Sequence, residues 1–445
     1  MNWTAIRDQV TKLLRDLIRF NTTNPPGNEL ACVEYIAASL RQEGIEPVVL
    51  ESAPGRGNVV ARLKGDGSLP PLLLMGHVDV VPAEADKWKH PPFSGDLVDG
   101  VVWGRGATDM KNMVAFELMT FLLLKRNGVP LKRDVIFMAT ADEETGGRMG
   151  AAWMVQNHPD LIQAEYAINE GGATSIVIGD TVFFVCSTAE KGSARFTLRA
   201  HGQPGHASLP HKQHAILTLS KALVKLIETP LPLHVTPSAR AHIEALARGV
   251  REPLRRDLLG LLDEATHADC LASLPVPDPT KRRLSASLHN TAVPTILRAG
   301  NKINVIPAEA DCQVDCRILP GTTLESLEEE LRAVVGHDVE IEFGPVAPPL
   351  ECDPDSPLFE TIREVIAERE NGAIVVPGLI TGGTDAKSIS KLGTKVLGFV
   401  PLRYEGPALT GLAHSHNERV SVANLEFGTR TLYETVTRFC GDASA

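Results

Sequence analysis

Short clusters of histidine and carboxylate residues occur along the chain in positions that could hold a divalent metal ion. The segment ADEETGG places Asp142, Glu143 and Glu144 side by side, directly after the apolar run VIFMAT. Three adjacent carboxylates at the end of a buried strand repel one another and lose hydration, so each is costly to keep ionised without a partner. We therefore expect a cation beside them.

Similar polar clusters follow other apolar runs of the chain. GHVDVVP follows LLLM, GRGATDMK follows VVW, NEGG follows YAI, and TGGTDA and LAHSHNE lie near the C-terminus. Ligands of open α/β sheets gather at the carboxyl ends of the strands, so we expect these clusters to converge. Imidazole and carboxylate without thiolate suit a divalent ion such as zinc, and several carboxylates allow one to bridge two ions. The pooled candidates are His77, Asp79, Asp109, Glu143, Glu144, Glu170, His414 and His416.

The elements that must position these residues alternate between strand and helix patterns. PVVLESAP, NVVARLKG, PLLLMGHVDVVP, DVIFMATA and YAINEGG are predicted strands, and CVEYIAASLRQEG, MVAFELMTFLLLKRNG and GRMGAAWMVQNHPD are predicted helices. This alternation predicts an α/β sheet covered on both faces.

The pattern changes near Lys191. SARFTLRAHGQ alternates apolar and polar residues, and it is followed by a helix, a long insertion, the strands TAVPTILRA and KINVIPAEADCQVDCRI, the helix TLESLEEELRAVVG and the strand VEIEFG. This order predicts a small split βαβ sheet with one solvent face. We therefore expect a catalytic domain at 1–190, an inserted domain at 191–345 and the rest of the catalytic domain at 346–445. The stretch from Pro237 to Asn290 gives no clear pattern.

The composition narrows the possible partners. The chain has 445 residues and a net charge of −11, and it carries no cluster of Lys and Arg, which argues against nucleic-acid and anionic-membrane partners. We expect no membrane span and no signal peptide, because the apolar runs are short and the N-terminal segment is amphipathic. Seven scattered cysteines without a CxxC pair favour buried thiols in a reducing cytoplasm.

Taken together and in order, the motifs resemble a family of dinuclear zinc enzymes. The family comprises aminoacylases, acetylornithine deacetylases, succinyl-diaminopimelate desuccinylases and glutamate carboxypeptidases. The motifs that carry the resemblance are GHVDVVP, GRGATDMK, DEETGG, NEGG, GHAS, NVIP followed by DCR, GGTDA and AHSHNE. The resemblance implies a zinc-exopeptidase-like α/β catalytic domain with a mixed central sheet flanked by helices. It also implies an inserted α+β, ferredoxin-like domain that serves as a lid or for dimerisation.

The same resemblance implies roles for individual residues. Asp79 would take the second imidazole proton of His77 and fix its tautomer. Glu143 would be the general base, passing a proton from water to the leaving amine. Zn²⁺ is the first choice of metal, although Co²⁺ or Mn²⁺ would accept the same ligands. The implied ligands are His77 and Glu170 on one ion, Glu144 and His414 (rather than His416) on the other, and Asp109 bridging both.

The inserted domain is expected to contribute to substrate binding. By resemblance, His206 in GQPGHAS supplies a donor to the oxyanion, often from the partner subunit of a homodimer. Arg317 and Asn304 match positions that bind the substrate carboxylate, although Arg317 could instead pair with Asp315 or Glu309. Backbone N–H groups of Gly382 and Gly383 are further candidates.

Three functions therefore remain open from the sequence. The favoured one is a two-metal hydrolase that releases an amino acid from an N-acyl amino acid or short peptide. A two-metal phosphoesterase would use similar ligands, but it needs Lys and Arg around the phosphate, and few are present in these motifs. A binding protein that has lost catalysis is the third, and the sequence offers no support for it, because Glu143 and all expected ligands are present.

Overall fold

The computed structural model describes residues 1–171 and 175–441 and separates into two compact units. The first comprises Met1–Thr188, Cys352–Pro377 and Thr384–Ala445, and the second comprises Ala189–Glu351 and Gly378–Gly383. The second unit thus ends at Glu351, later than the expected boundary, and takes in the short segment that carries Gly382 and Gly383. Its role as a lid or dimerisation domain stays a prediction.

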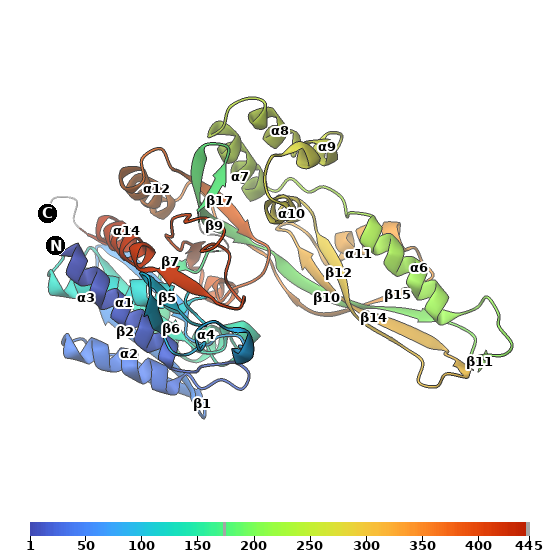
Figure 1. Cartoon of the computed structure of the whole chain (residues 1–445), viewed down its shortest axis with the longest axis horizontal. Helices are drawn as coiled ribbons and strands as arrows, with labels where there is room; N and C mark the ends of the chain where they lie inside the picture. The colour runs from blue at the N-terminus through green and yellow to red at the C-terminus, as the bar shows by residue number, and fades with distance from the viewer. Residues whose placement is uncertain (172–174, 442–445) are drawn as a thin grey trace. The chain divides into compact units, whose positions relative to one another are not determined.

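A mixed sheet forms the centre of the first unit (Figure 1). Strand β3 pairs in parallel with β6 and β7, β7 pairs in parallel with β18, and β1, β2 and β6 pair antiparallel. The expected α/β fold with a mixed central sheet is therefore confirmed. The order is β1-β2-β6-β3-β7-β18-β9-β16, with β8 and β17 also paired to β9. The strands are β1 Val48–Ala53, β2 Arg56–Leu63, β3 Leu69–His77, β6 Arg133–Thr140, β7 Tyr166–Asn169, β8 Ile176–Ile178, β9 Thr181–Glu190, β16 Leu350–Glu351, β17 Ile374–Ile380 and β18 Lys395–Gly398.

Helices cover this sheet. Helix α3 is buried along most of its length because it packs on β3 and β6 and also contacts α1 and α14 (Figure 1). In β3, Leu72, Leu73, Leu74 and Met75 are all fully buried, as expected for a strand covered on both faces. The helices of this unit are α1 Trp3–Arg19, α2 Leu30–Gln42, α3 Lys111–Arg126, α4 Ala151–Asn157, α5 Pro159–Ile162, α12 Pro357–Arg369, α13 Ala386–Ile389 and α14 Val422–Cys440, with 3₁₀ turns η1 Ala85–Lys87, η2 Glu143–Thr145 and η3 Ser390–Leu392.

The apolar run VVW forms a strand outside the central sheet. Strand β5 (Val101–Trp103), which precedes GRGATDMK, pairs with β4 (Asp96–Val98) and β19 (Arg419–Ser421) in a separate small sheet. The strand before GRGATDMK thus belongs to a different sheet from the strands that precede GHVDVVP, DEETGG and NEGG. Its location brings the GRGATDMK segment next to the chain that leads into β19.

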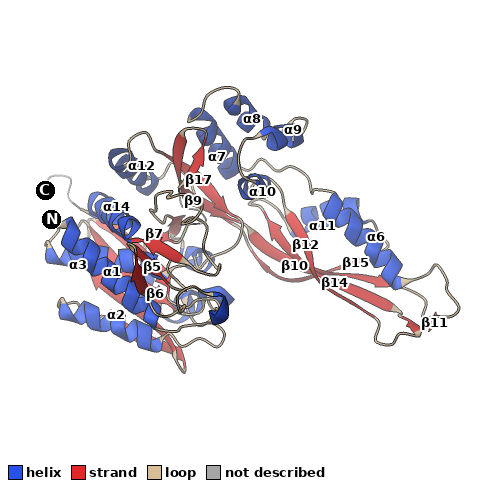
Figure 2. Cartoon of the chain, viewed as in Figure 1, coloured by secondary structure: helices blue, strands red, loops and turns tan. Residues whose placement is uncertain are grey.

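The second unit contains an antiparallel sheet in the order β12-β14-β10-β15. Helices α6 and α11 pack on one face of it, and their blue ribbons lie beside the red strands in Figure 2. The sequence order β10-α6-β12-β14-α11-β15 is the split βαβ arrangement expected of this part. These elements are β10 Gly192–His201, α6 Ala215–Glu228, β12 Thr291–Ala299, β14 Glu309–Ile318, α11 Leu324–Val335 and β15 Glu340–Ala347.

The predicted strand KINVIPAEADCQVDCRI is in fact two strands. Strand β13 (Val305–Ile306) pairs antiparallel with β11 (Gly205–His206) in a separate two-stranded sheet, and β14 begins only at Glu309. Pro307 lies between them and has no N–H group to donate to a sheet, which favours the interruption. Asn304 consequently lies in a turn rather than in a strand.

The stretch from Pro237 to Asn290 is helical. Pro237 occupies the first turn of α7, whose N-cap Thr236 accepts a hydrogen bond from the Ala239 N–H. Four short helices follow one another here: α7 Pro237–Arg248, α8 Leu254–Gly260, α9 His267–Ser273 and α10 Asp278–Ala286. Across the described parts of the chain, no helix is long and apolar enough to span a bilayer.

Candidate metal centre

His77, the last residue of β3, is oriented by its neighbours and faces a group of carboxylates. Its side chain is 1% exposed. Its Nδ1 lies 3.0 Å from the backbone oxygen of Asp79, and because a carbonyl only accepts, Nδ1 carries the proton. Nε2 therefore presents a lone pair in the neutral ring, 3.3 Å from Asp109 Oδ1 and 3.9 Å from Glu143 Oε2.

Asp109 lies between two histidines. Its Oδ1 is 3.3 Å from His77 Nε2, and its Oδ2 is 3.1 Å from His414 Nε2. A carboxylate that offers one oxygen to each of two imidazoles has the arrangement needed to bridge two ions. Glu144 Oε2 also lies 3.1 Å from His414 Nε2, and Glu170 Oε1 lies 4.0 Å from His77 Nε2.

The electrostatics of these groups favour a bound cation. Burial lowers the pKa of His77, but the adjacent carboxylates of Asp109 and Asp79, at 3.3 and 3.4 Å, outweigh it and raise that pKa well above its ordinary value. Hydrogen bonds to Asp109 and Glu144 raise the pKa of His414 to about 10. Burial and the charge of Glu170 raise the pKa of Glu143 well above its ordinary value. The cluster thus holds more negative charge than it can solvate, and it attracts protons where metal ions would bind.

The residues fit a divalent metal. Two sets of ligand atoms lie within 4.8 Å of one another, His77 with Asp109 and Glu144, and His77 with Glu143 and Glu170. His77 Nε2 is buried and makes no hydrogen bond of normal geometry to any described residue, as expected of a lone pair reserved for an ion. The structure brings together all the residues expected to be ligands. Gly172, the last residue of NEGG, lies outside the described residues.

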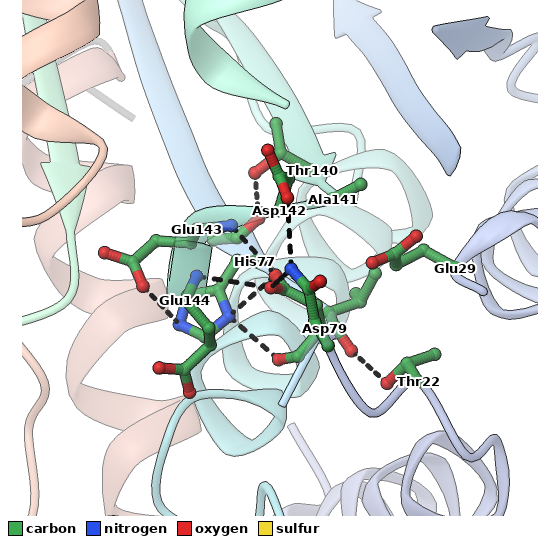
Figure 3. Close-up of polar contacts among 12 residues, drawn as sticks. Thr22, Glu29, His77, Asp79, Thr140, Ala141, Asp142, Glu143 and Glu144 are labelled. Atoms are coloured by element: carbon green, nitrogen blue, oxygen red, sulfur yellow. Dashed lines mark hydrogen bonds and ion pairs between the residues drawn. The ribbon is translucent and has the colours of Figure 1, made fainter. Parts of the chain in front are cut away.

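The carboxylate of Asp79 acts mainly on the turn that carries Glu143 and Glu144 (Figure 3). Its Oδ1 accepts from the Glu143 N–H at 3.1 Å, and its Oδ2 accepts from the Glu144 N–H at 3.2 Å. Its distance to His77 Nδ1 is 3.4 Å, longer than the 3.0 Å from Nδ1 to its backbone oxygen. Asp79 therefore orients His77 through the main chain more than through the expected carboxylate contact.

The three adjacent carboxylates of ADEETGG have different partners. Asp142 Oδ1 lies 2.9 Å from Arg56 Nη2, and its Oδ2 accepts from the Met149 N–H at 3.0 Å. Asp142 also has a φ of 71°, which turns the chain so that the two following glutamates face His77 and His414. The cation beside Asp142 is therefore Arg56, and only Glu143 and Glu144 of the three carboxylates face the candidate metal centre.

Glu418 is a positioning residue that the sequence reasoning missed. Its Oε1 accepts from the backbone N–H groups of Thr108 and Asp109 at 2.6 and 3.0 Å, and its Oε2 accepts from the N–H of Gly106 and from Arg105. The carboxylate is fully buried, so these donors replace its hydration. Glu418 therefore fixes the loop that presents Asp109. The Asn-Glu pair that ends AHSHNE was the only signal for it in the sequence.

Glu418→Gln is expected to weaken metal binding by about 10–100-fold, because an amide cannot accept from all five donors, which include the Thr108 hydroxyl, and the Asp109 loop loosens. Competition with a fluorescent chelator measures this affinity. The matched control is Glu426→Gln, a partly exposed carboxylate on α14. Unchanged metal affinity in Glu418→Gln, with the chain still folded, would contradict the positioning role.

Asp385, in TGGTDA, is a second buried acid that the candidate set omitted. Its Oδ2 accepts from Thr140 Oγ1 at 3.2 Å, at the end of β6. Burial raises the pKa of Asp385 to about 7. The sequence reasoning selected the two preceding glycines instead, and these belong to the second unit.

The remaining candidates also lie in the second unit. His206 is exposed in β11, and the Ala207 N–H donates to the Asn304 oxygen at 3.1 Å, so these two segments are neighbours. Arg317 Nε donates to Asp315 Oδ2 at 2.9 Å, which is the alternative pairing considered from the sequence. The catalytic or binding roles of these residues stay predictions.

Comparison with known proteins settles the family. A family model described as Peptidase family M20/M25/M40 matches residues 73–438. The chain belongs to this family. The expected family is thereby confirmed, and so is the reaction class: the chain is a metal-dependent hydrolase of amide or peptide bonds that releases an amino acid. The identity of the metal stays a prediction.

Individual members of the M20 family cover most of the chain. The N-fatty-acyl-amino acid synthase/hydrolase PM20D1 of Mus musculus is 31% identical over 418 residues, covering 88% of this chain and 80% of its own. The M20 family metallo-carboxypeptidase Sso-CP2 from Sulfolobus solfataricus has a TM-score of 0.68 at 18% identity, with 96% and 98% coverage. The Bacillus subtilis YXEP protein, a dinuclear metal binding peptidase, has a TM-score of 0.62 at 16% identity, with 98% of each chain covered. These two structures support the fold.

Proposed function

We propose that this M20 enzyme hydrolyses N-acyl amino acids, and secondarily short peptides, using two zinc ions. The ligands are His77, Asp109, Glu144, Glu170 and His414. The observation that carries the proposal is the Asp109 carboxylate, which offers one oxygen to each of two histidines. The PM20D1 relative supports the N-acyl amino acid as first choice. Cobalt or manganese would accept the same ligands.

The chemistry is divided between the ions and the chain. When bound, the ions supply Lewis acidity to the scissile carbonyl and to water. Glu143 takes the proton of the attacking water at its carboxylate and returns it to the leaving amine. Asp79 holds Glu143 and Glu144 in place through their N–H groups.

His206 is proposed to donate a hydrogen bond to the oxyanion that forms at the attacked carbonyl. The Ser208 N–H lies 3.2 Å from His206 Nδ1, and because an N–H only donates, Nδ1 is bare. In the neutral ring the proton is then on Nε2, which becomes the donor the oxyanion needs. We propose that His206 of one subunit acts in the metal centre of the other subunit of a homodimer.

Mixing two inactive variants tests that placement. Glu143→Gln and His206→Ala chains are each expected to be nearly inactive alone. When they are mixed and allowed to exchange subunits, activity is expected to reappear, because one centre of the mixed dimer has both an intact Glu143 and the intact partner histidine. A mixture as inactive as its components, with exchange verified by tags, would contradict action in trans.

The substrate carboxylate is proposed to bind Arg317, with Asn304, Gly382 and Gly383 as further contacts. Arg317→Met is expected to raise KM for an N-acyl amino acid by about 10–100-fold, because a charged hydrogen bond is lost. Turnover of the methyl ester, which carries no carboxylate, should change little. The matched control is Arg195→Met, since Arg195 also contacts Asp315, at 2.8 Å. Equal effects on acid and ester would contradict carboxylate recognition.

We propose a cellular location and an oligomeric state for the enzyme, each from one observation. All seven cysteines are free, which supports a reducing cytoplasm. Ile216, Leu217, Val224 and Ile227 are exposed on α6, which supports a homodimer formed through the second unit. Light scattering of the purified protein measures the dimer, and a monomer at working concentrations would contradict it.

A further inference from the structure

Two histidines face each other in the helical part of the second unit, in the region whose sequence gave no clear pattern. His267 begins α9, and His289 lies just before β12. Their Nε2 atoms are 3.2 Å apart. His267 is buried, and His289 is partly buried. Neither residue belongs to the metal centre of the first unit.

Both rings are oriented by backbone carbonyls. His267 Nδ1 lies 2.9 Å from the Leu261 oxygen, and His289 Nδ1 lies 2.7 Å from the Leu231 oxygen. Carbonyl oxygens only accept, so both Nδ1 atoms carry a proton. In neutral rings the two facing Nε2 atoms are then both bare, and two lone pairs at 3.2 Å repel each other. The contact needs a cation between them, either a proton or a metal ion.

The geometry of the rings favours a metal ion over a shared proton. Two imidazoles on one tetrahedral ion at ~2.0–2.1 Å place their nitrogens about 3.3 Å apart and their ring centres about 5 Å apart. A straight N–H···N bond of 3.2 Å would separate the ring centres by about 5.5 Å. The observed centres are 4.9 Å apart, with the ring planes at 79°. The two nitrogens therefore converge on a common point beside the line that joins them.

The surroundings disfavour a shared proton as well. Burial lowers the pKa of His289, so the imidazolium that a shared proton requires is costly. Both histidines line a cavity of about 400 Å³ together with Glu264 and Glu330. Glu330 accepts from Asn290 at 3.0 Å and lies 2.8 Å from His234 Nε2. The cavity thus offers room for water ligands and negative charge to balance an ion.

The protein also orders these rings in the way that metal sites do. Imidazole ligands in metal sites usually donate their second N–H to a carbonyl or carboxylate, which fixes the tautomer and aims the free nitrogen. Both histidines make such a contact, from Nδ1 to a backbone oxygen. We propose that His267 and His289 bind a third divalent transition-metal ion, such as zinc, with water completing its coordination.

Metal content of the full-length protein tests the proposal. The wild type, His267→Gln, His289→Gln and the control His201→Gln are stripped with chelator, dialysed against zinc and analysed by mass spectrometry. His201 is an exposed histidine of the same unit that contacts Glu309 and Glu340. We expect His267→Gln and His289→Gln each to hold one zinc ion fewer per chain than the wild type, and His201→Gln to match the wild type.

A second readout keeps the test independent of folding. One equivalent of copper(II), which binds imidazole ligands more tightly than zinc and should replace it at the pair, is expected to give a paramagnetic resonance spectrum with splitting from two imidazole nitrogens, absent in His289→Gln. Equal zinc content in the wild type and both pair variants would overturn the proposal and leave a shared proton as the explanation of the contact. An equal loss in His201→Gln would overturn it too, since the extra zinc would then be bound unspecifically at the surface.

Discussion

Glu143→Gln is expected to lower kcat by about 10²–10⁴-fold, because glutamine cannot accept the proton of the attacking water or return it to the amine. The side chain keeps its size, and its N–H contact to Asp79 belongs to the main chain, so the turn should hold its shape. Metal content should stay at the wild-type value, since the ligand Glu144 remains bound to Asp79 through its own N–H.

This combination separates catalysis from metal binding. Hydrolysis of an N-acyl amino acid gives kcat, and mass spectrometry gives the metal bound per chain. The control is Glu46→Gln, an exposed glutamate whose loss should leave both values unchanged. A Glu143→Gln enzyme that keeps wild-type kcat would contradict its role as the base.

Asp109→Ala is expected to remove both metal ions together, and with them all activity. Each Asp109 oxygen faces a different histidine, so a single substitution removes a ligand from both positions. It also leaves Glu144 and His414 without the carboxylate that completes their site. A measurement of metal content during titration with zinc should show no tight binding at this centre.

The outcome that would contradict a bridging Asp109 is the retention of one tightly bound ion at the centre. Making the substitution in a His289→Gln background removes the contribution of the third site, proposed at His267 and His289, to the measured metal content. Asp86→Ala, an exposed aspartate in η1, is the control and should bind zinc as the parent does.

The expectation that ligands gather at the carboxyl ends of the sheet strands predicted part of the metal centre and not the rest. His77 ends β3 and the turn at Glu143 follows β6, and these strands are parallel neighbours, so their convergence could be anticipated from the chain alone. Asp109 reaches the same place by another route, from a small separate sheet. Its position depends on the buried Glu418, more than 300 residues later in the sequence. Short-range pattern gives no information about such a contact.

Residues that act through tertiary contacts were the ones missed. Asp385 and Glu418 are buried acids whose partners come from distant segments. The inserted helices α8 and α9 are only seven residues long, which is too short for a helical period to show in the sequence. The His267 and His289 pair was invisible for the same reason: 22 residues separate the two, and neither belongs to a recognisable motif. By contrast, the order of motifs was sufficient to identify the family.

The most direct test of the account is amino-acid release from a panel of N-acyl amino acids and dipeptides by the metal-loaded enzyme, with and without chelator. We predict release that chelator abolishes and added zinc restores, with N-acyl amino acids preferred. Release that persists after the metal has been stripped, verified by mass spectrometry on the same sample, would contradict the metal-dependent mechanism at His77 and Asp109.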